Sequence, residues 1–70
     1  MINKNKITII GLGYIGLPLA IEFSKYYELI GFDKSITRIK DLKKNDKINF
    51  ELIKNINQIK NSNIYIIAVP

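Results

Sequence analysis

The chain contains no cysteine and no histidine, and these two absences limit the chemistry that its side chains can perform. Without cysteine there is no disulfide framework, no thiolate nucleophile and no cysteine-based metal site. Without histidine, the commonest acid/base and metal-ligand side chain is missing. The sequence therefore predicts no catalytic residue and no metal site, and it favours binding through backbone groups and carboxylates.

The chain is also short, since its 70 residues allow at most one small domain with a modest core. Hydrophobic residues make up 47% of it and charged residues 24%, with both signs present. This composition is typical of a folded domain and not of a disordered tail.

Positive charge exceeds negative charge, with 11 Lys and Arg residues against 6 Asp and Glu residues. The lysines are scattered from Lys4 to Lys60, with no run longer than Lys43-Lys44, and no basic motif is interleaved with aromatic residues. Such a dispersed excess is weak evidence for an anionic macromolecule. We therefore expect no nucleic-acid partner.

The N-terminal segment admits a second interpretation, as a secretory signal. Residues 1–6 are basic, and residues 7–21 are uncharged and mostly apolar. However, the apolar run is too short to span a bilayer, lacks a small-x-small cleavage site and contains three glycines at fixed spacing. We expect a cytoplasmic protein with no membrane partner.

Hydrophobic patterns predict the order strand, helix, strand, helix in the first part of the chain. Ile7–Ile10 is a β-branched run bounded by glycine, which is typical of a strand buried on both faces of a parallel sheet. From about Tyr14 to Tyr26 apolar residues recur every four positions, so we expect a helix whose regular part begins near Ile15. Glu28–Phe32 predicts a second strand, and Ser35 is placed to cap a second helix. The apolar stripe of this second helix would comprise Ile36, Ile39 and Leu42.

The rest of the chain is less regular, beginning with a polar turn at Lys43–Asn49. Phe50–Ile53 is predicted to be a short strand followed by a helical turn at Ile56–Lys60. The alternative is one amphipathic helix from Phe50 to Lys60, because apolar residues also recur there at three-residue steps. Ile64–Val69 is a continuous apolar run and predicts another strand buried on both faces.

Gly11, Gly13 and Gly16 form a G-x-G-x-x-G motif directly after the first predicted strand and directly before the first helix. Gly11 allows a tight turn, Gly13 lets the backbone approach a pyrophosphate, and Gly16 lets the helix pack close to the strand. The free N–H groups and the positive end of the helix dipole would then face the phosphates. A glycine-rich turn can also serve close packing alone, and this alternative stays open.

Asp33 supplies the context that favours a dinucleotide cofactor. It follows the second predicted strand, where a carboxylate would bond the adenosine ribose hydroxyls, although it could instead cap the following helix. A carboxylate at this ribose repels the additional phosphate of NADP, so the predicted cofactor is NAD. Arg38, one turn into the second helix, is placed to reach the adenosine end, or it is an ordinary solvated residue.

The run Gly-Leu-Gly-Tyr-Ile-Gly-Leu-Pro-Leu-Ala from Gly11 to Ala20, followed by Ile-Gly-Phe-Asp at 30–33, resembles the N-terminus of the UDP-glucose/GDP-mannose dehydrogenases. The ending 64–70 is similar to a later strand of the same family, which continues into a Thr-Pro loop at the nicotinamide side. The resemblance is close over about 6–45 and moderate over 50–70. It also accounts for Pro18, which is tolerated in this run although proline in a helix interior removes a hydrogen bond.

The resemblance implies a partial Rossmann α/β fold, with a parallel sheet in the order 3-2-1-4 and flanking helices. It implies an NAD-dependent enzyme that oxidises the 6-hydroxyl of a nucleotide sugar twice, through a Cys-bound intermediate, to give a uronic acid for polysaccharide synthesis. The glycine run would hold the pyrophosphate, Asp33 the adenosine ribose and Arg38 the neighbouring adenosine contact, while Pro70 would begin the loop toward the nicotinamide. The cofactor-binding residues carried over are Gly11, Leu12, Gly13, Tyr14, Ile15, Gly16, Asp33 and Arg38.

Two departures from the family pattern limit what this chain is expected to do alone. The family has roughly a dozen more residues between the second helix and the third strand, compressed here into Asn45–Asn49. The catalytic Cys, its Lys and Asn helpers, the rest of the cofactor domain and the sugar-nucleotide domain would all follow Pro70. We therefore expect residues 1–70 to be an incomplete N-terminal NAD-binding domain that is inactive alone. We expect this chain either to self-associate through an exposed strand at Ile64–Val69 or to be loosely packed. The alternatives are a degenerate or truncated remnant without function and the N-terminus of a different Rossmann dehydrogenase.

Overall fold

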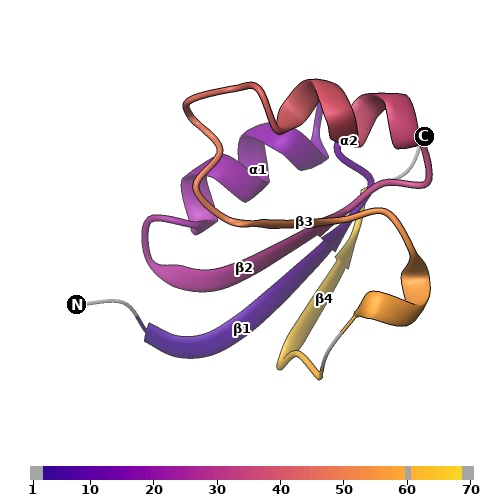
Figure 1. Cartoon of the computed structure of the whole chain (residues 1–70). Helices are drawn as coiled ribbons and strands as arrows, with labels where there is room; N and C mark the ends of the chain where they lie inside the picture. The colour runs from indigo at the N-terminus through magenta and orange to yellow at the C-terminus, as the bar shows by residue number, and fades with distance from the viewer. Residues whose placement is uncertain (1–2, 60, 69–70) are drawn as a thin grey trace.

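A computed structural model describes residues 3–59 and 61–68 as one parallel sheet with two α-helices on one of its faces (Figure 1). The elements in chain order are β1 (Asn3–Ile10), α1 (Gly16–Phe23), β2 (Tyr27–Phe32), α2 (Ile36–Leu42), β3 (Glu51–Ile53), the 3₁₀ turn η1 (Ile56–Gln58) and β4 (Ile64–Ile67).

The four strands lie in the order β3-β2-β1-β4, and all three strand pairs are parallel. In the middle of the sheet, Ile9 of β1 pairs with Gly31 on one side and with Ile66 on the other. The β1–β2 and β2–β3 connections pass over the same face, through α1 and α2 (Figure 1). The predicted partial Rossmann fold and its strand order are confirmed.

The hydrophobic core lies between the sheet and the two helices. Ile9 and Leu12 are completely shielded from solvent, and Ile39 of α2 is almost so. Two of the three residues predicted for the apolar stripe of α2 are buried, whereas Ile36 is 53% exposed because it lies in the first turn, away from the sheet. The buried core cluster comprises Ile7, Ile9, Leu12, Ala20, Leu29, Ile39 and Leu42.

The helix boundaries follow from local hydrogen bonding. Pro18 is the third residue of α1, within the first turn, where a helix does not use the backbone N–H that proline lacks. Helix α1 ends at Phe23, three residues earlier than predicted, because the chain must turn before β2 begins at Tyr27. Ser35 caps α2 as predicted, with its Oγ accepting the N–H of Arg38 at 3.2 Å.

The ambiguous stretch after Phe50 forms a strand and a separate helical turn, not a single amphipathic helix. Glu51–Ile53 pairs with the end of β2, which takes these residues out of any helix. The turn η1 is short and self-capped: the side chain of Asn55 accepts the N–H of Asn57, and the N–H of Asn55 donates to Gln58 Oε1. Lys60, the predicted end of this turn, lies outside the described residues.

Strand β4 is less buried than its hydrophobic pattern alone suggests. Ile64, Tyr65 and Ile67 are 45%, 50% and 69% exposed, and of its four residues only Ile66 packs against the core. The apolar run is typical of a strand buried on both faces, but in the predicted order 3-2-1-4 this strand is an edge. The structure has β4 paired with β1 alone, so its exposure in the described part agrees with the exposed strand expected of residues 1–70. Val69, at the end of the predicted strand, lies outside the described residues.

Candidate dinucleotide-binding site

A groove of about 810 Å³ opens at the carboxyl ends of β1 and β2. In open parallel sheets, ligands bind outside these strand ends, at the point where successive connections diverge to opposite sides. Here β1 is that point, because β2 lies on one side of it and β4 on the other. The groove is lined by Ile10, Gly11, Gly13, Tyr14, Ile15, Phe32, Asp33, Lys34 and Ala68.

Gly11 makes the sharp turn that starts the glycine-rich loop. Its φ angle is 102°, a left-handed conformation that residues with a side chain rarely adopt. Its N–H donates to the carbonyl of Phe32 at 2.8 Å, so the loop begins tied to the end of β2. The predicted tight-turn role of Gly11 therefore has a backbone cause.

Gly16 permits close packing between α1 and the loop. A Cβ atom at this position would overlap the carbonyl oxygen of Gly11 and lie 2.8 Å from its carbonyl carbon. It would also lie 3.2 Å from the Cβ of Ala68. Because the nearest atoms are backbone, no side-chain movement can relieve the overlap, and packing within the chain accounts for this glycine.

Gly13 has no such structural explanation. A Cβ atom built on it would meet nothing within 4 Å, and its backbone does not have a positive φ. Packing alone therefore explains Gly16 but not Gly13. The open space over Gly13 faces the groove and is what the close approach of a ligand to the backbone requires.

Three successive backbone N–H groups at this wall are free to bind an anion. Within the part of the chain that the structure describes, the N–H groups of Gly13, Tyr14 and Ile15 donate to no acceptor. They immediately precede α1, where the helix dipole adds partial positive charge. The side chains of Tyr14 and Ile15 are 102% and 69% exposed, so the wall presents backbone donors. Such a set suits phosphate oxygens without any lysine or arginine.

Asp33 lies at the rim of the groove and has both of its carboxylate oxygens engaged. Oδ2 accepts the N–H of Leu12 at 3.0 Å, and Oδ1 accepts the N–H of Ser35 at 2.9 Å. Asp33 is thus not the N-cap of α2, which is Ser35, but it does support the start of that helix. An ionised carboxylate offers about four acceptor positions, so capacity remains for ribose hydroxyls.

Leu12, Gly16 and Arg38 are predicted site residues that do not line the groove. The side chain of Leu12 is fully buried in the core. Arg38 is half-buried, and its Nε donates to the carbonyl of Leu12 at 3.0 Å. The contact between Arg38 and Leu12 was not predicted, because the two residues lie 26 positions apart and only the fold brings them together.

Other lining residues could have been found from the strand ends alone. Phe32 ends β2 and Ala68 follows β4, and both occupy the edge at which the predicted site lies. Lys34 follows Asp33 and puts an exposed cation next to the proposed ribose site. The predicted loop beginning at Pro70 lies outside the described residues.

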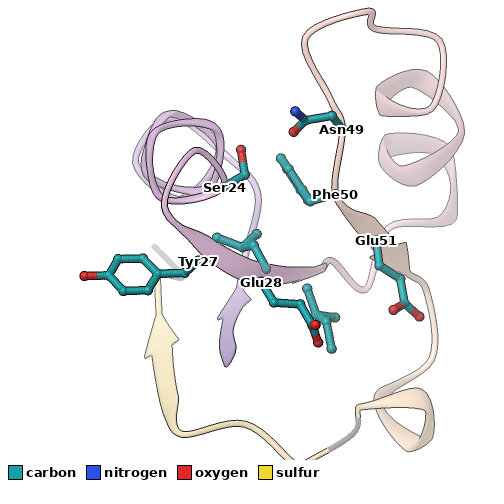
Figure 2. Close-up of a pocket in the computed structure, with 8 residues that line it drawn as sticks. Ser24, Tyr27, Glu28, Asn49, Phe50 and Glu51 are labelled. Atoms are coloured by element: carbon teal, nitrogen blue, oxygen red, sulfur yellow. The ribbon is translucent and has the colours of Figure 1, made fainter. Parts of the chain in front are cut away.

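A second cavity, of about 310 Å³, lies between the end of α1, the start of β2 and the segment entering β3 (Figure 2). It contains none of the predicted site residues and lies next to the amino end of β2, opposite the end at which such sheets bind ligands. Its carboxylates, Glu28 and Glu51, are exposed, and Lys6 pairs with Glu28 at 3.3 Å. The described residues contain no group of three or more potential metal-binding side chains. Nor does any helix among them have the length and hydrophobicity needed to cross a membrane.

Comparison with known proteins identifies the family of this chain. Residues 5–55 match the model of the UDP-glucose/GDP-mannose dehydrogenase family, NAD binding domain. The chain is 43% identical to the UDP-N-acetyl-D-glucosamine 6-dehydrogenase of Salmonella typhi, with 99% of the chain covered, and 39% identical to Protein CapL of Staphylococcus aureus, with 97% covered. It is 33% identical to the UDP-N-acetyl-D-glucosamine 6-dehydrogenase of Pseudomonas aeruginosa, with 93% covered. No solved structure matches significantly.

The relatives are much longer than this chain, which spans 19%, 19% and 18% of their lengths. The alignment with the Salmonella protein covers 82 positions, so at least 12 of them have no residue in a chain of 70. This number agrees with the size of the shortening predicted from the resemblance. The matched domain binds NAD, which confirms the predicted cofactor.

Proposed function

Since this chain belongs to the UDP-glucose/GDP-mannose dehydrogenase family, we propose that its groove binds the adenosine and pyrophosphate portion of NAD. The observation that carries the proposal is the set of three N–H groups at Gly13, Tyr14 and Ile15 that donate to no acceptor among the described residues, next to open space over Gly13. Backbone donors at a helix N-terminus form an anion site that a packing role does not require.

Each predicted cofactor-binding residue receives a role in this proposal. Gly11 shapes the loop, and the three residues from Gly13 to Ile15 donate their N–H groups to the pyrophosphate. The free acceptor positions of Asp33 take the hydroxyls of the adenosine ribose. The remaining three residues support the loop: Leu12, Gly16 and Arg38.

The same arrangement favours NAD over NADP. The added phosphate of NADP would lie next to the carboxylate of Asp33, which both repels it and is already held in place by two backbone N–H groups. Lys34 is adjacent but exposed, so water screens its charge and it offsets only part of this repulsion.

For the whole protein, we propose an NAD-dependent dehydrogenase that oxidises the 6-hydroxyl of a nucleotide sugar to a uronic acid. Two of the similar proteins are named UDP-N-acetyl-D-glucosamine 6-dehydrogenase, which makes that sugar nucleotide the first substrate to test. Bound NAD would supply the hydride acceptor. The resemblance implies a catalytic cysteine, and because these 70 residues hold none, that nucleophile would come from outside them. A cytoplasmic location and a role in polysaccharide biosynthesis belong to the same proposal and rest on the family resemblance.

The test of cofactor binding is a calorimetric titration of the 70-residue chain with NAD, NADP and UDP-N-acetylglucosamine. We expect saturable binding of NAD, weaker binding of NADP and none of the sugar nucleotide, with ADP-ribose displacing NAD. A folded chain that binds neither NAD nor ADP-ribose would contradict the proposal.

A chimaera tests the rival interpretation of a remnant without function. In it, this chain replaces the matching segment of the Salmonella dehydrogenase. NADH formation from UDP-N-acetylglucosamine would support a working cofactor-binding half. A folded chimaera without activity or NAD binding would favour the remnant.

A further inference from the structure

The backbone of Leu12 is held from two sides by charged side chains that follow β2. Asp33 Oδ2 accepts its N–H at 3.0 Å, and Arg38 Nε donates to its carbonyl at 3.0 Å. The side chain of Leu12 is fully buried, so this residue is fixed at three points. The three residues that follow it are exposed.

The two charged side chains are themselves connected through the start of α2. Asp33 Oδ1 accepts the N–H of Ser35 at 2.9 Å, and Ser35 Oγ accepts the N–H of Arg38 at 3.2 Å. Leu12, Asp33, Ser35 and Arg38 therefore form a closed circuit of hydrogen bonds. The circuit joins the glycine-rich loop to α2 without any ligand.

The contact from Arg38 controls the peptide unit that joins Leu12 to Gly13. A trans peptide is planar, and its C=O and N–H point in opposite directions. None of the described peptide bonds is cis. An arginine that holds the carbonyl of Leu12 therefore also sets the direction of the N–H of Gly13, which is the first of the three free donors.

We propose that Arg38 is a positioning residue that orients the Leu12–Gly13 peptide, so that the glycine-rich loop has its anion-binding shape before the cofactor arrives. The proposal rests on the proposed cofactor site and adds a cause for its affinity, because a preorganised loop loses less freedom on binding. It differs from a direct adenosine contact: Arg38 does not line the groove, and its Nε is engaged with Leu12.

The first test uses the 70-residue chain without ligand. Arg38→Met removes the donor but keeps a long apolar side chain, and Lys40→Met removes a cation from an exposed position of the same helix as the matched control. We expect the amide ¹⁵N resonances of Gly13, Tyr14 and Ile15 to shift or broaden in Arg38→Met and to stay unchanged in Lys40→Met. Unchanged loop resonances in a folded Arg38→Met chain would overturn the proposal.

The second test separates positioning from direct contact by comparing adenosine with ADP. Loss of loop order should weaken ADP by about tenfold in Arg38→Met, which is the effect of one hydrogen bond to a charged group. Adenosine, which has no phosphate, should lose less than about twofold. Equal losses for the two ligands would assign Arg38 to the adenosine and refute the positioning role.

A conservative variant keeps the proposal testable if Arg38→Met does not fold. Arg38→Lys retains the charge but offers an ammonium in place of the planar guanidinium, so we expect smaller changes in the same amides and partial recovery of ADP affinity. A folded Arg38→Lys chain with wild-type amides and wild-type ADP affinity would count against the need for the Nε contact. If the wild-type chain binds neither ADP nor NAD, the proposed function fails, and the comparison of amides without ligand still decides the role of Arg38 in the loop.

Discussion

Replacing Gly13 by alanine tests whether the groove is shaped for a ligand. The added Cβ meets no atom within 4 Å, and the backbone does not have a positive φ. Alanine also restricts the unfolded chain more than glycine does, which stabilises a compatible site by about 0.4–1 kcal/mol. We therefore expect the free energy of unfolding of Gly13→Ala to equal that of the wild type or to rise by up to about 1 kcal/mol.

The same substitution should impair cofactor binding. The methyl group would occupy the space through which a pyrophosphate approaches the free N–H groups of the loop. Losing even one hydrogen bond to a charged group costs about 1.5 kcal/mol, so NAD affinity should fall by at least about tenfold. Calorimetric titration with NAD and urea denaturation of the same sample measure the two effects separately.

Gly16 and Gly31 provide the comparison within the same chain. At Gly31 a Cβ would lie 3.1 Å from side-chain atoms of Leu12 and Phe50, which can move, so we expect a loss of about 1 kcal/mol. At Gly16 the overlap is with backbone, so the loss should exceed about 3 kcal/mol and unfold a domain of this size. Thr37→Ala, at an exposed position of α2, is the neutral control.

Wild-type NAD affinity in Gly13→Ala, or a loss of more than about 2 kcal/mol in the free energy of unfolding of that variant, would refute the reasoning.

Three further predictions concern the ribose site, the reaction and the sheet edge. Asp33→Asn should reduce the preference for NAD over NADP and lower the free energy of unfolding by about 1–2 kcal/mol, because two backbone N–H groups lose a carboxylate acceptor. Dissociation constants and urea midpoints measure the two effects, and an unchanged ratio of NAD to NADP affinity would contradict the prediction. The 70-residue chain mixed with NAD and UDP-N-acetylglucosamine should form no more NADH than a blank without protein, since the chain has no cysteine and no histidine. Measurable NADH formation by the chain would disprove this prediction. Ile67→Lys should reduce the self-association measured by sedimentation velocity, because it puts a charge on the uncharged edge strand β4. A wild-type chain that stays monomeric at high concentration would argue against that edge as an interface.

The sequence predicts the part of the site that depends on local backbone geometry. Gly11 and Gly16 have roles set by turn and helix geometry, and both follow from the motif and its place between a strand and a helix. Asp33 is a candidate on a related ground, because it directly follows the strand next to the motif. Hydrogen bonds between distant residues are not encoded in spacing. Its place one turn into the second helix and the family resemblance make Arg38 a candidate adenosine contact, but only the packing of α2 beside the loop reveals its contact with Leu12.

The hydrophobic pattern of β4 and its place in the sheet give different expectations for its burial, and the structure follows the place in the sheet. A continuous apolar run is typical of a strand covered on both faces. The pattern indicates that the segment is apolar enough to be covered, but it does not show whether covering elements are present. At the other edge, β3 has only three residues, contains the exposed Glu51 and is followed by the exposed Lys54, all of which discourage pairing with another chain. Strand β4 has no charged residue, and Ile67 is 69% exposed beside an unpaired backbone edge. Of the two edges, β4 is therefore the one at which a neighbouring strand gains the most buried apolar surface, and a single lysine there should have the largest effect on association.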